Sequence, residues 1–250
     1  MTRIALLADL HFGAHDPLLV AALEEDLEAM APDAVAVAGD LTYRARPEEF
    51  AAAAAFLARL GRPVVAVPGN HDIPNLRLFD RFLDPFRAWR AAMGADTEPG
   101  WGNAEVALLG LNTVRRMSLK RDWSAGRVSP GQLLRLGLRA AAWPGRLLFV
   151  VAHHPFEHPP GEEARGRLGR APLALRAFAQ LGISAVLTGH LHRPTVMAAP
   201  GTPMLVITGT AVSWRLRAGV QNAWSLIEAG PEGVVVSHRG YGPAGFAPLL

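Results

Sequence analysis

The amino-acid sequence predicts an α/β fold built around a largely parallel, buried β-sheet. Strand-like and helix-like patterns alternate over the first 70 residues, which is typical of βαβ units. Strand-like runs such as Val64–Val67 are apolar without alternation, a pattern that suits strands covered on both faces. Half of the 250 residues are hydrophobic and 19% are charged, so we expect residues 1–250 to bury a sizeable core as one domain.

The expected elements follow one another along the whole chain. Strands are expected at Ile4–Ala8, Ala34–Ala38, Val64–Val67, Val106–Leu111, Leu147–Ala152, Ala185–Thr188, Met204–Thr208, Ala223–Glu228 and Val234–His238. Helices are expected at Leu18–Met30, Pro47–Leu60 and Pro172–Leu181. The last two strands flank the turn residues 230–233 and are expected to form an antiparallel hairpin. Two regions, Ile73–Gly102 and His158–Arg170, show neither pattern and are expected to be irregular loops.

Composition narrows the classes of cofactor and partner. The chain has no cysteine, so His, Asp, Glu or Asn must bind any metal ion. Lys120 is the only lysine, and the arginines are dispersed apart from a cluster with Arg115, Arg116 and Arg121. Nucleic acid is therefore not expected as the main partner, and phosphate recognition by a few arginines is the alternative. Neither a bilayer-spanning stretch nor a signal-peptide pattern is found, which favours a cytoplasmic protein without a membrane partner.

Polar side chains that can bind metal ions follow several of the expected strands, at the point where each strand ends. In chain order they are Asp9-x-His11, Gly39-Asp40, Gly69-Asn70-His71-Asp72, His153-His154-Pro155 and Gly189-His190-x-His192. Ligands of open α/β sheets bind outside the carboxyl ends of the strands, so we expect these groups to converge on one edge of one sheet. Taken singly, an Asp-x-His pair can be incidental and a Gly-Asp pair can be a turn or a helix cap. Their recurrence in order favours a metal site.

This mixture of imidazole and carboxylate groups suits metal ions that activate water. The candidate ligands are Asp9, His11, Asp40, Asn70, His153, His190 and His192. The set is larger than one ordinary site needs, but it suits two sites that share a bridging carboxylate. Two metal ions can hold both the attacking and the leaving oxygen of an in-line displacement at phosphorus. The residues therefore predict hydrolysis of a phosphoester at a dinuclear metal centre.

The ordered series of motifs resembles the signature of the calcineurin-like metallophosphoesterase superfamily over the span from Asp9 to His192. The resemblance implies an αββα sandwich of two packed mixed β-sheets flanked by helices. It implies one metal ion held by Asp9, His11, Asp40 and His192, and another held by Asp40, Asn70, His153 and His190, with Asp40 as the bridge. His71 would lie beside the substrate phosphate, where it would steady the transition-state charge or protonate the leaving oxygen.

Three stretches also resemble bacterial phosphodiesterases that are described as cyclic-nucleotide phosphodiesterases, namely residues 9–13, 39–42 and 81–86. This resemblance implies hydrolysis of small diesters, either cyclic nucleotides or glycerophosphodiesters, by in-line attack of a metal-bridging hydroxide. A phosphomonoesterase, a nuclease and a non-enzymatic scaffold of the same fold are the alternatives. The ligand types admit two ions of manganese, iron or zinc without selecting among them, and the oligomeric state is not indicated.

Several residues beside the motifs keep more than one interpretation. The family pattern His-x-Pro selects His153 as the ligand, which leaves His154 to support or pack against it. The loop Asn112–Arg116 follows another strand and either brings an arginine to the substrate or is a solvated basic loop. Asp72 is expected to orient His71 or a neighbouring backbone group. His15, His158 and His238 lack a motif and are not expected to bind metal, although His15 and His158 could lie near the mouth of the site.

Overall fold

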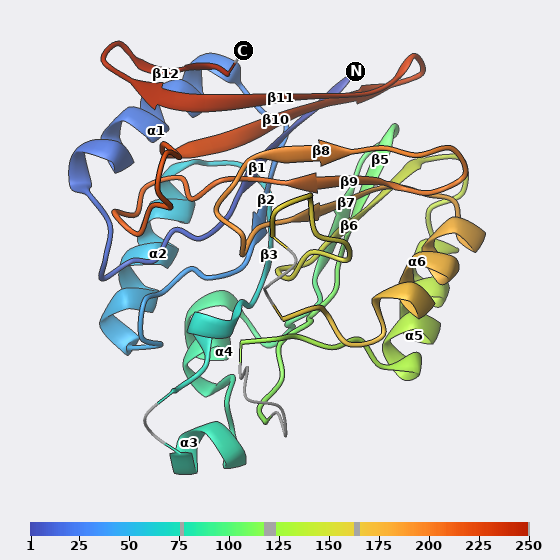
Figure 1. Ribbon diagram of the computed structural model, residues 1–250, viewed down its shortest axis with the longest axis horizontal. Helices are drawn as coiled ribbons and strands as arrows, with labels where there is room; N and C mark the ends of the chain where they lie inside the picture. Colours follow the sequence, from blue (N-terminus) through green and yellow to red (C-terminus); the bar gives the residue numbers. More distant parts are fainter. Residues whose placement is uncertain (76–77, 118–123, 163–165, 250) are drawn as a thin grey trace.

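The computed structural model describes residues 1–75, 78–117, 124–162 and 166–249, which form two β-sheets packed face to face between helices (Figure 1). The first sheet has the order β12-β11-β10-β1-β2-β3, and the second has the order β4-β5-β6-β7-β9-β8. The first contains β1 (Thr2–Leu7), β2 (Ala34–Ala38), β3 (Val64–Val67), β10 (Ala223–Gly230), β11 (Gly233–Gly242) and β12 (Gly245–Pro248). The second contains β4 (Gly100–Gly102), β5 (Val106–Gly110), β6 (Leu147–Val151), β7 (Ile183–Thr188), β8 (Thr195–Met197) and β9 (Met204–Ile207).

Helices cover the outer face of each sheet. Helices α1 (Pro17–Met30) and α2 (Pro47–Arg59) pack on the first sheet, and α5 (Pro130–Ala140) and α6 (Ala171–Gln180) pack on the second. Two shorter helices, α3 (Leu78–Leu83) and α4 (Arg87–Met93), lie together at one end of the molecule in Figure 1. The layers therefore run helix, sheet, sheet, helix, and the expected αββα sandwich is confirmed.

Both sheets are mixed, with parallel strands at their centres. Strands β1, β2 and β3 are parallel, whereas β10, β11 and β12 continue the first sheet with antiparallel pairing. Strands β5, β6, β7 and β9 are parallel, and β4 and β8 are antiparallel edge strands. The expected hairpin is confirmed, because β10 and β11 pair up to Gly230 and Gly233.

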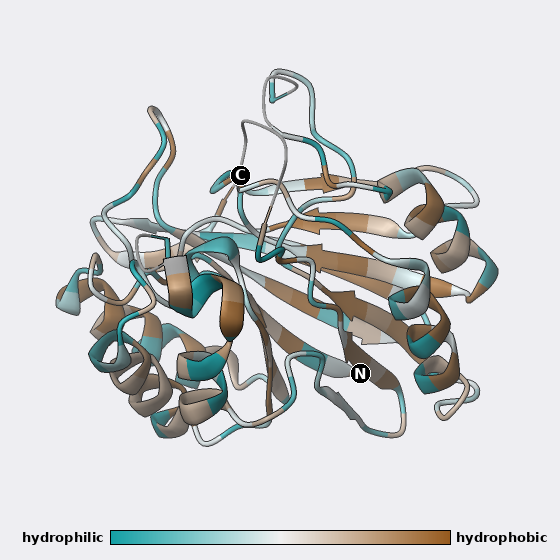
Figure 2. Ribbon diagram, turned by 90° about the horizontal axis from the view of Figure 1, so that it is seen from below, coloured by the Kyte–Doolittle hydropathy of each residue, from teal (hydrophilic) through white to brown (hydrophobic). Residues whose placement is uncertain are grey.

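The central strands are buried on both faces. In β1, Ala5 and Leu7 pack against the helices, whereas Ile4 and Leu6 belong to the core between the two sheets. Alternate residues of a strand point to opposite faces, so a strand with two buried faces needs an apolar residue at every position. This explains the unbroken apolar runs, which Figure 2 shows as hydrophobic strands in the interior.

Local capping explains where several helices begin. Asp16 precedes α1 and its carboxylate accepts a hydrogen bond from Leu18 N at 2.9 Å. Ser129 precedes α5, where its hydroxyl accepts from Gln132 N at 3.2 Å and its own N–H donates to Gln132 Oε1 at 3.0 Å. This is a capping box followed by Pro130 at the first helical position. We did not predict α5 from the sequence, although Ser129, Pro130 and Gln132 carry the signal for it.

Two expectations about the fold are wrong. The strand ends with metal-binding residues do not share one sheet, since β1, β2 and β3 belong to the first sheet and β6 and β7 to the second. An apolar run shows that both faces of a strand are buried, but not which sheet the strand joins.

The region Ile73–Gly102 is not an irregular loop, because it contains α3, α4 and β4. These short elements depend on distant partners rather than on local pattern. Arg81 of α3, for example, is 2% exposed and donates to the backbone oxygens of Pro74 and Arg116. Of residues 158–170, the part that the structure describes contains no helix or strand beyond an isolated bridge at Gly169. Within the described ranges, no helix combines the length and apolar character needed to cross a bilayer.

Candidate metal centre

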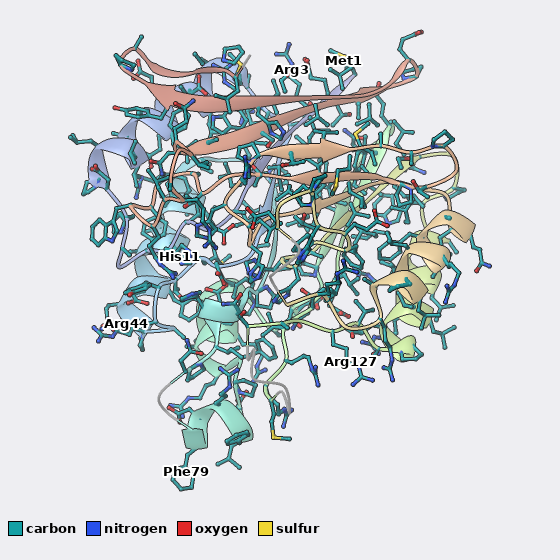
Figure 3. All side chains as sticks on the ribbon, viewed as in Figure 1. Met1, Arg3, His11, Arg44, Phe79 and Arg127 are labelled. Carbon is teal, nitrogen blue, oxygen red and sulfur yellow. The ribbon has the colours of Figure 1, made fainter. Side chains whose placement is uncertain are left out.

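The loops that follow β1, β2, β3, β6 and β7 meet where the carboxyl ends of the two sheets adjoin. Backbone hydrogen bonds join them, from Asp9 N to Gly39 O at 3.0 Å and from Gly189 N to His153 O at 3.1 Å. Another runs from His190 N to the Asp9 carboxylate at 2.8 Å. Figure 3 shows His11 inside this region, away from the end of the molecule that carries Met1 and Arg3. The structure thus brings all the candidate ligands together from two sheets.

Most of the candidate ligands lie at unusual backbone positions. Asp9, His11, Asp40, His190 and His192 all have positive φ angles, between 46° and 69°. Residues other than glycine rarely adopt this left-handed conformation, and strain of this kind clusters at functional sites. Here it occurs in the loops after β1, β2 and β7, which carry these five candidate ligands.

The first group of ligand atoms is almost fully enclosed. His192 Nε2 lies 3.1 Å from Asp9 Oδ1, and His11 Nε2 lies 3.9 Å from both Asp9 Oδ1 and Asp40 Oδ2. Each of these side chains is less than a tenth exposed. Two carboxylates and two imidazoles therefore face one another with little access to bulk water.

The second group lies beside the first and shares Asp40 with it. His153 Nε2 is 3.0 Å from Asn70 Oδ1, 3.1 Å from His190 Nδ1 and 3.5 Å from Asp40 Oδ2. Asp40 Oδ2 is thus 3.5 Å from an imidazole nitrogen of this group and 3.9 Å from His11 Nε2 of the other. A carboxylate oxygen between two clusters is in the position that a bridging ligand requires.

The spacing of these atoms fits metal ions. Ligands about 2.1 Å from one ion lie roughly 3.0–3.4 Å apart in octahedral or tetrahedral geometry, close to the separations at His153 and His192. His153 Nδ1 donates to Ala38 O at 2.9 Å, so in the neutral ring Nε2 carries a lone pair that faces the oxygens of Asn70 and Asp40. A cation between these facing acceptor atoms would satisfy them.

Backbone carbonyls fix which nitrogen of each imidazole faces the site. A carbonyl oxygen only accepts, so the ring nitrogen beside it must carry the proton. His11 Nδ1 lies 3.3 Å from Thr42 O, and His192 Nδ1 lies 2.9 Å from Arg215 O, as His153 Nδ1 does from Ala38 O. In all three rings Nε2 is therefore left with its lone pair toward the site, as a metal ligand requires.

The electrostatics favour charged carboxylates and neutral imidazoles. Burial by itself would raise the pKa of Asp9, but the neighbouring imidazoles, His192 above all, hold that pKa well below its usual range. Burial lowers the pKa of His11 to about 4, although Asp40 and Asp9 oppose the shift, and burial lowers the pKa of His190 well below its ordinary value. His192 differs, because its contact with Asp9 outweighs burial and raises its pKa. Ionised carboxylates and neutral rings are the forms that bind metal.

His71 lies at the mouth of the site rather than among the innermost groups. Its Nδ1 is 2.8 Å from Tyr43 O, and its ring packs edge-on to His11 with centroids 4.8 Å apart. Its Nε2 accepts a hydrogen bond from Arg215 Nη1 at 3.0 Å. His71 borders a cavity of about 690 Å³ whose other lining residues include Tyr43, Arg44 and Asn75. A side chain placed there can reach a substrate while remaining beside the metal ligands.

Arg215 is the site residue that our sequence analysis missed. Besides its bond to His71, Nη1 lies 3.5 Å from His11 Nε2, and its guanidinium carbon lies 5.1 Å from the centre of the Tyr43 ring. Its backbone oxygen is the acceptor for His192. Arg215 follows β9 in a segment without any motif, and we find no pattern in the sequence that would have identified it.

Asp72 and His154 support the site without belonging to the ligand groups. The Asp72 carboxylate accepts from Leu41 N at 3.1 Å, Thr42 N at 2.9 Å and Gly69 N at 2.8 Å, and so ties two loops together. Burial, with the charge of Asp40, raises its pKa to about 7. Asp72 thus orients backbone groups rather than the His71 ring.

Both ring nitrogens of His154 have protein partners, Thr113 Oγ1 at 2.7 Å and Ser124 O at 2.6 Å.

Other residues singled out from the sequence lie elsewhere. Arg116 donates to Phe82 O at 3.1 Å, so its guanidinium is directed toward α3. Lys120 and Arg121 lie outside the described residues. The remaining histidines have partners away from the ligand groups: His15 accepts from Gly13 N, His158 contacts Glu162 O, and His238 contacts Ser225 Oγ on the first sheet.

Comparisons with known proteins agree with this geometry. The family model for calcineurin-like phosphoesterases matches residues 2–194. A probable cyclic nucleotide phosphodiesterase from Synechococcus is 24% identical over 243 residues, 92% of this chain and 88% of that protein. The glycerophosphodiester phosphodiesterase GpdQ from Enterobacter lignolyticus is 49% identical over 67 residues, 27% of this chain and 22% of that protein. A dimetal phosphatase from Danio rerio shares the fold, with a TM-score of 0.70 at 13% identity over 96% of each chain.

Proposed function

The chain belongs to the calcineurin-like phosphoesterase family, and on that premise we propose that it is a two-metal phosphodiesterase that hydrolyses small phosphodiesters. Phosphoester hydrolysis and the use of two metal ions are properties of the family and agree with the clustered His and Asp side chains. The preference for diesters, either cyclic nucleotides or glycerophosphodiesters, is our own extension from the two phosphodiesterase relatives. We take residues 1–250 to form a single metallophosphoesterase domain.

The observation that carries the proposal is the shared position of Asp40. One of its oxygens lies within 4 Å of imidazole nitrogens in both groups, His11 on one side and His153 on the other. We assign Asp40 as the bridge between two metal ions. The first ion would also take Asp9, His11 and His192, and the second would take Asn70, His153 and His190. The donor set of oxygen and nitrogen suits manganese, iron or zinc.

Bound in this way, the ions would supply Lewis acidity that activates water and neutralises charge on the phosphoryl oxygens. The chain's own residues would hold and orient the substrate. His71 borders the cavity, where with its ring protonated it would donate from Nε2 to a phosphoryl oxygen or give that proton to the leaving oxygen, in place of the bond that Nε2 accepts from Arg215. Arg215 adds a positive charge beside it, which suits an anionic phosphodiester as it gains charge in the transition state.

Hydrolysis of two chromogenic esters tests the proposal. The purified protein, loaded with manganese, iron or zinc in turn, is assayed with bis(p-nitrophenyl) phosphate and with p-nitrophenyl phosphate. We expect faster turnover of the diester and loss of both activities with a chelator. Faster turnover of the monoester would favour a phosphomonoesterase, and no turnover with any metal would favour the scaffold.

Two substitutions test the residues. Asp40→Asn should abolish turnover and lower the metal content while the protein stays folded, because the bridging oxygen is lost. His71→Ala should keep the metal content and lose most of the rate. Full activity of Asp40→Asn at matched metal content would refute the ligand assignment.

A further inference from the structure

A second cavity continues from the one beside His71. The first, of about 690 Å³, is lined by polar and charged side chains such as Arg44, Arg46 and His71 together with Pro47 and Pro74. The second, of about 640 Å³, also includes Pro47 and Pro74 in its lining. Because the two cavities share these residues, a ligand can extend from the candidate catalytic residues into the second cavity without leaving the protein surface.

The second cavity is an apolar groove between α2 and α4, which pack together. Phe50 of α2 forms part of its lining and rests edge-on against the buried Trp89 of α4, with ring centroids 6.2 Å apart. Ala54 on α2 and Ala91 on α4 also line it. Small side chains on both helices keep the groove open, and we call it the α2–α4 groove.

The groove has a length that suits a single hydrocarbon chain. Its lining on α2 extends from Pro47, next to the polar cavity, to Ala54. At 1.5 Å per helical residue these seven steps correspond to about 10 Å. Two large apolar side chains of α3 remain in solvent, Phe79 at 85% and Leu83 at 80% exposure, and Leu83 lines the groove. Figure 3 shows Phe79 at the end of the molecule that carries α3.

The charges follow the same division. The polar cavity near His71 is lined by Arg44 and Arg46 with one acidic residue, Glu48, whereas the groove is lined by Asp80 and Asp84 with one basic residue, Arg87. Asp84 is already paired with Arg90 at 2.5 Å. An anionic group is therefore favoured at the His71 end and disfavoured in the groove, where an uncharged apolar group fits best.

We propose that the α2–α4 groove binds the apolar chain of an amphiphilic phosphodiester whose phosphate lies at His71 and the metal centre. This inference rests on the proposed function and names its substrate class, a phosphodiester in which one esterified alcohol carries a single alkyl or acyl chain. The polar cavity holds the phosphate and its polar substituent, and the groove holds the chain. Apolar contact along the groove then contributes binding that a small, fully polar diester does not receive.

A series of p-nitrophenyl alkyl phosphates tests the proposal with the metal-loaded protein. A fully buried methylene would raise kcat/KM about fourfold, the factor that corresponds to ~0.8 kcal/mol. The groove is open on one side, so we expect about half of that free energy, roughly a twofold gain per methylene. The octyl ester should therefore exceed the methyl ester by about 100-fold, and longer chains should add little once the groove is full.

Two substitutions that fill the groove provide the structural control. Ala54→Leu and Ala91→Leu should bring the octyl ester close to the methyl ester and leave turnover of the methyl ester unchanged. Ala91 is exposed, so its substitution should not impair folding. Ala52→Leu is the matched control for Ala54→Leu. Ala52 is also an alanine of α2, and it is exposed and does not line the groove. This variant should keep the full chain-length dependence.

The outcomes separate this inference from the proposed function. Turnover of the methyl ester without any gain from chain length would refute the groove assignment and leave the phosphodiesterase proposal intact, whereas no turnover of any ester would refute both. A chain-length gain that survives in Ala54→Leu and Ala91→Leu would place the chain elsewhere and overturn the inference.

Two lipid substrates distinguish a soluble single-chain diester from a bilayer lipid. The first is lysophosphatidylcholine below its critical micelle concentration, and the second is diacyl phosphatidylcholine in vesicles. We expect hydrolysis of the former, and hydrolysis of the vesicle lipid alone would contradict a single-chain site. A dimer in solution that Ala91→Leu dissociates would show that a second copy covers the groove and would also overturn the inference.

Discussion

Replacement of Arg215 should slow hydrolysis strongly without emptying the metal centre. Its Nη1 donates to His71 Nε2 at 3.0 Å, which holds the guanidinium at the edge of the cavity that we assign to the substrate. A charge about 4 Å from a phosphoryl oxygen interacts with it by about 4 kcal/mol at an effective dielectric constant of 20. Arg215 is half-buried, so we reduce this to about 3 kcal/mol, or roughly a 100-fold to 200-fold loss of kcat/KM. Loss of one preorganised donor to a developing oxyanion costs a similar factor.

The assay compares Arg215→Gln with Arg116→Gln as the matched control. Arg116 is one of the two arginines of the Asn112–Arg116 loop, and its guanidinium donates to Phe82 O, away from the ligand groups. Arg116→Gln should therefore keep the activity of the unmodified protein. Both variants should keep their metal content, because the contact of Arg215 with His192 is made by a backbone oxygen that the substitution does not remove.

Chemical rescue separates a direct role of Arg215 from a structural one. Arg215→Ala leaves a space at the cavity edge, so added guanidinium ion at millimolar concentration should restore part of the lost rate. Guanidinium should have no such effect on the unmodified protein. A loss of less than threefold in Arg215→Gln, or a loss that merely follows a lower metal content, would refute the reasoning.

The structure supports further predictions about stability and metal binding. Gly69→Ala should lower metal content and melting temperature, because the added Cβ would lie 2.1 Å from Asp40 Oδ1, whereas Gly137→Ala, which meets only ordinary contacts, should do neither. Without metal, the free energy of unfolding should fall as the pH drops from 7 to 5. Burial holds the pKa of His11 near 4 and that of His154 near 3, so both rings stay neutral in the fold while the unfolded chain takes up protons below about pH 6.5. Each contributes a loss of about 2 kcal/mol by pH 5. Asp72, whose pKa burial raises to about 7, takes up a proton in the fold over the same range and offsets about one of these losses, so a net fall remains. A free energy of unfolding that rises as the pH drops, in urea titrations with chelator, would contradict this assignment. Asp40→Gly and Asp40→Ala should both be inactive, yet the glycine variant should be more stable by about 1 kcal/mol because φ at this position is +53°; equal unfolding midpoints would argue against backbone strain.

The positions of the candidate ligands could be predicted from sequence because their signal is local. Each follows an apolar run, and parallel strands in a sheet end on the same side, so their side chains must gather at one end of the fold. That reasoning holds for Asp9 and Asp40, which follow neighbouring strands. It failed for the partition into sheets, since His153 and His190 reach the same site from the second sheet. Which apolar run pairs with which is decided by long-range packing that no local pattern records.

Arg215 shows the opposite case, because no local pattern in the sequence indicates that its side chain lies beside His71. Its guanidinium reaches His71 across 144 positions of the chain. The sequence instead drew attention to the loop Asn112–Arg116, where the basic side chain of Arg116 turns toward Phe82. Ser129 and Gln132 lie between these extremes, because their capping box is a local signal that predicts α5 and was overlooked.

The strain in the ligand-bearing loops links the fold to the metal centre. Left-handed backbone costs roughly 1–2 kcal/mol at each non-glycine residue, and Asp9, His11, Asp40, His190 and His192 all adopt it. Hydrogen bonds from three backbone N–H groups to Asp72 hold two of the loops in place, and the bond from His190 N to Asp9 joins two others. A cation that binds only the folded arrangement adds its binding free energy to that of folding. Metal binding and folding should therefore be strongly coupled at this site.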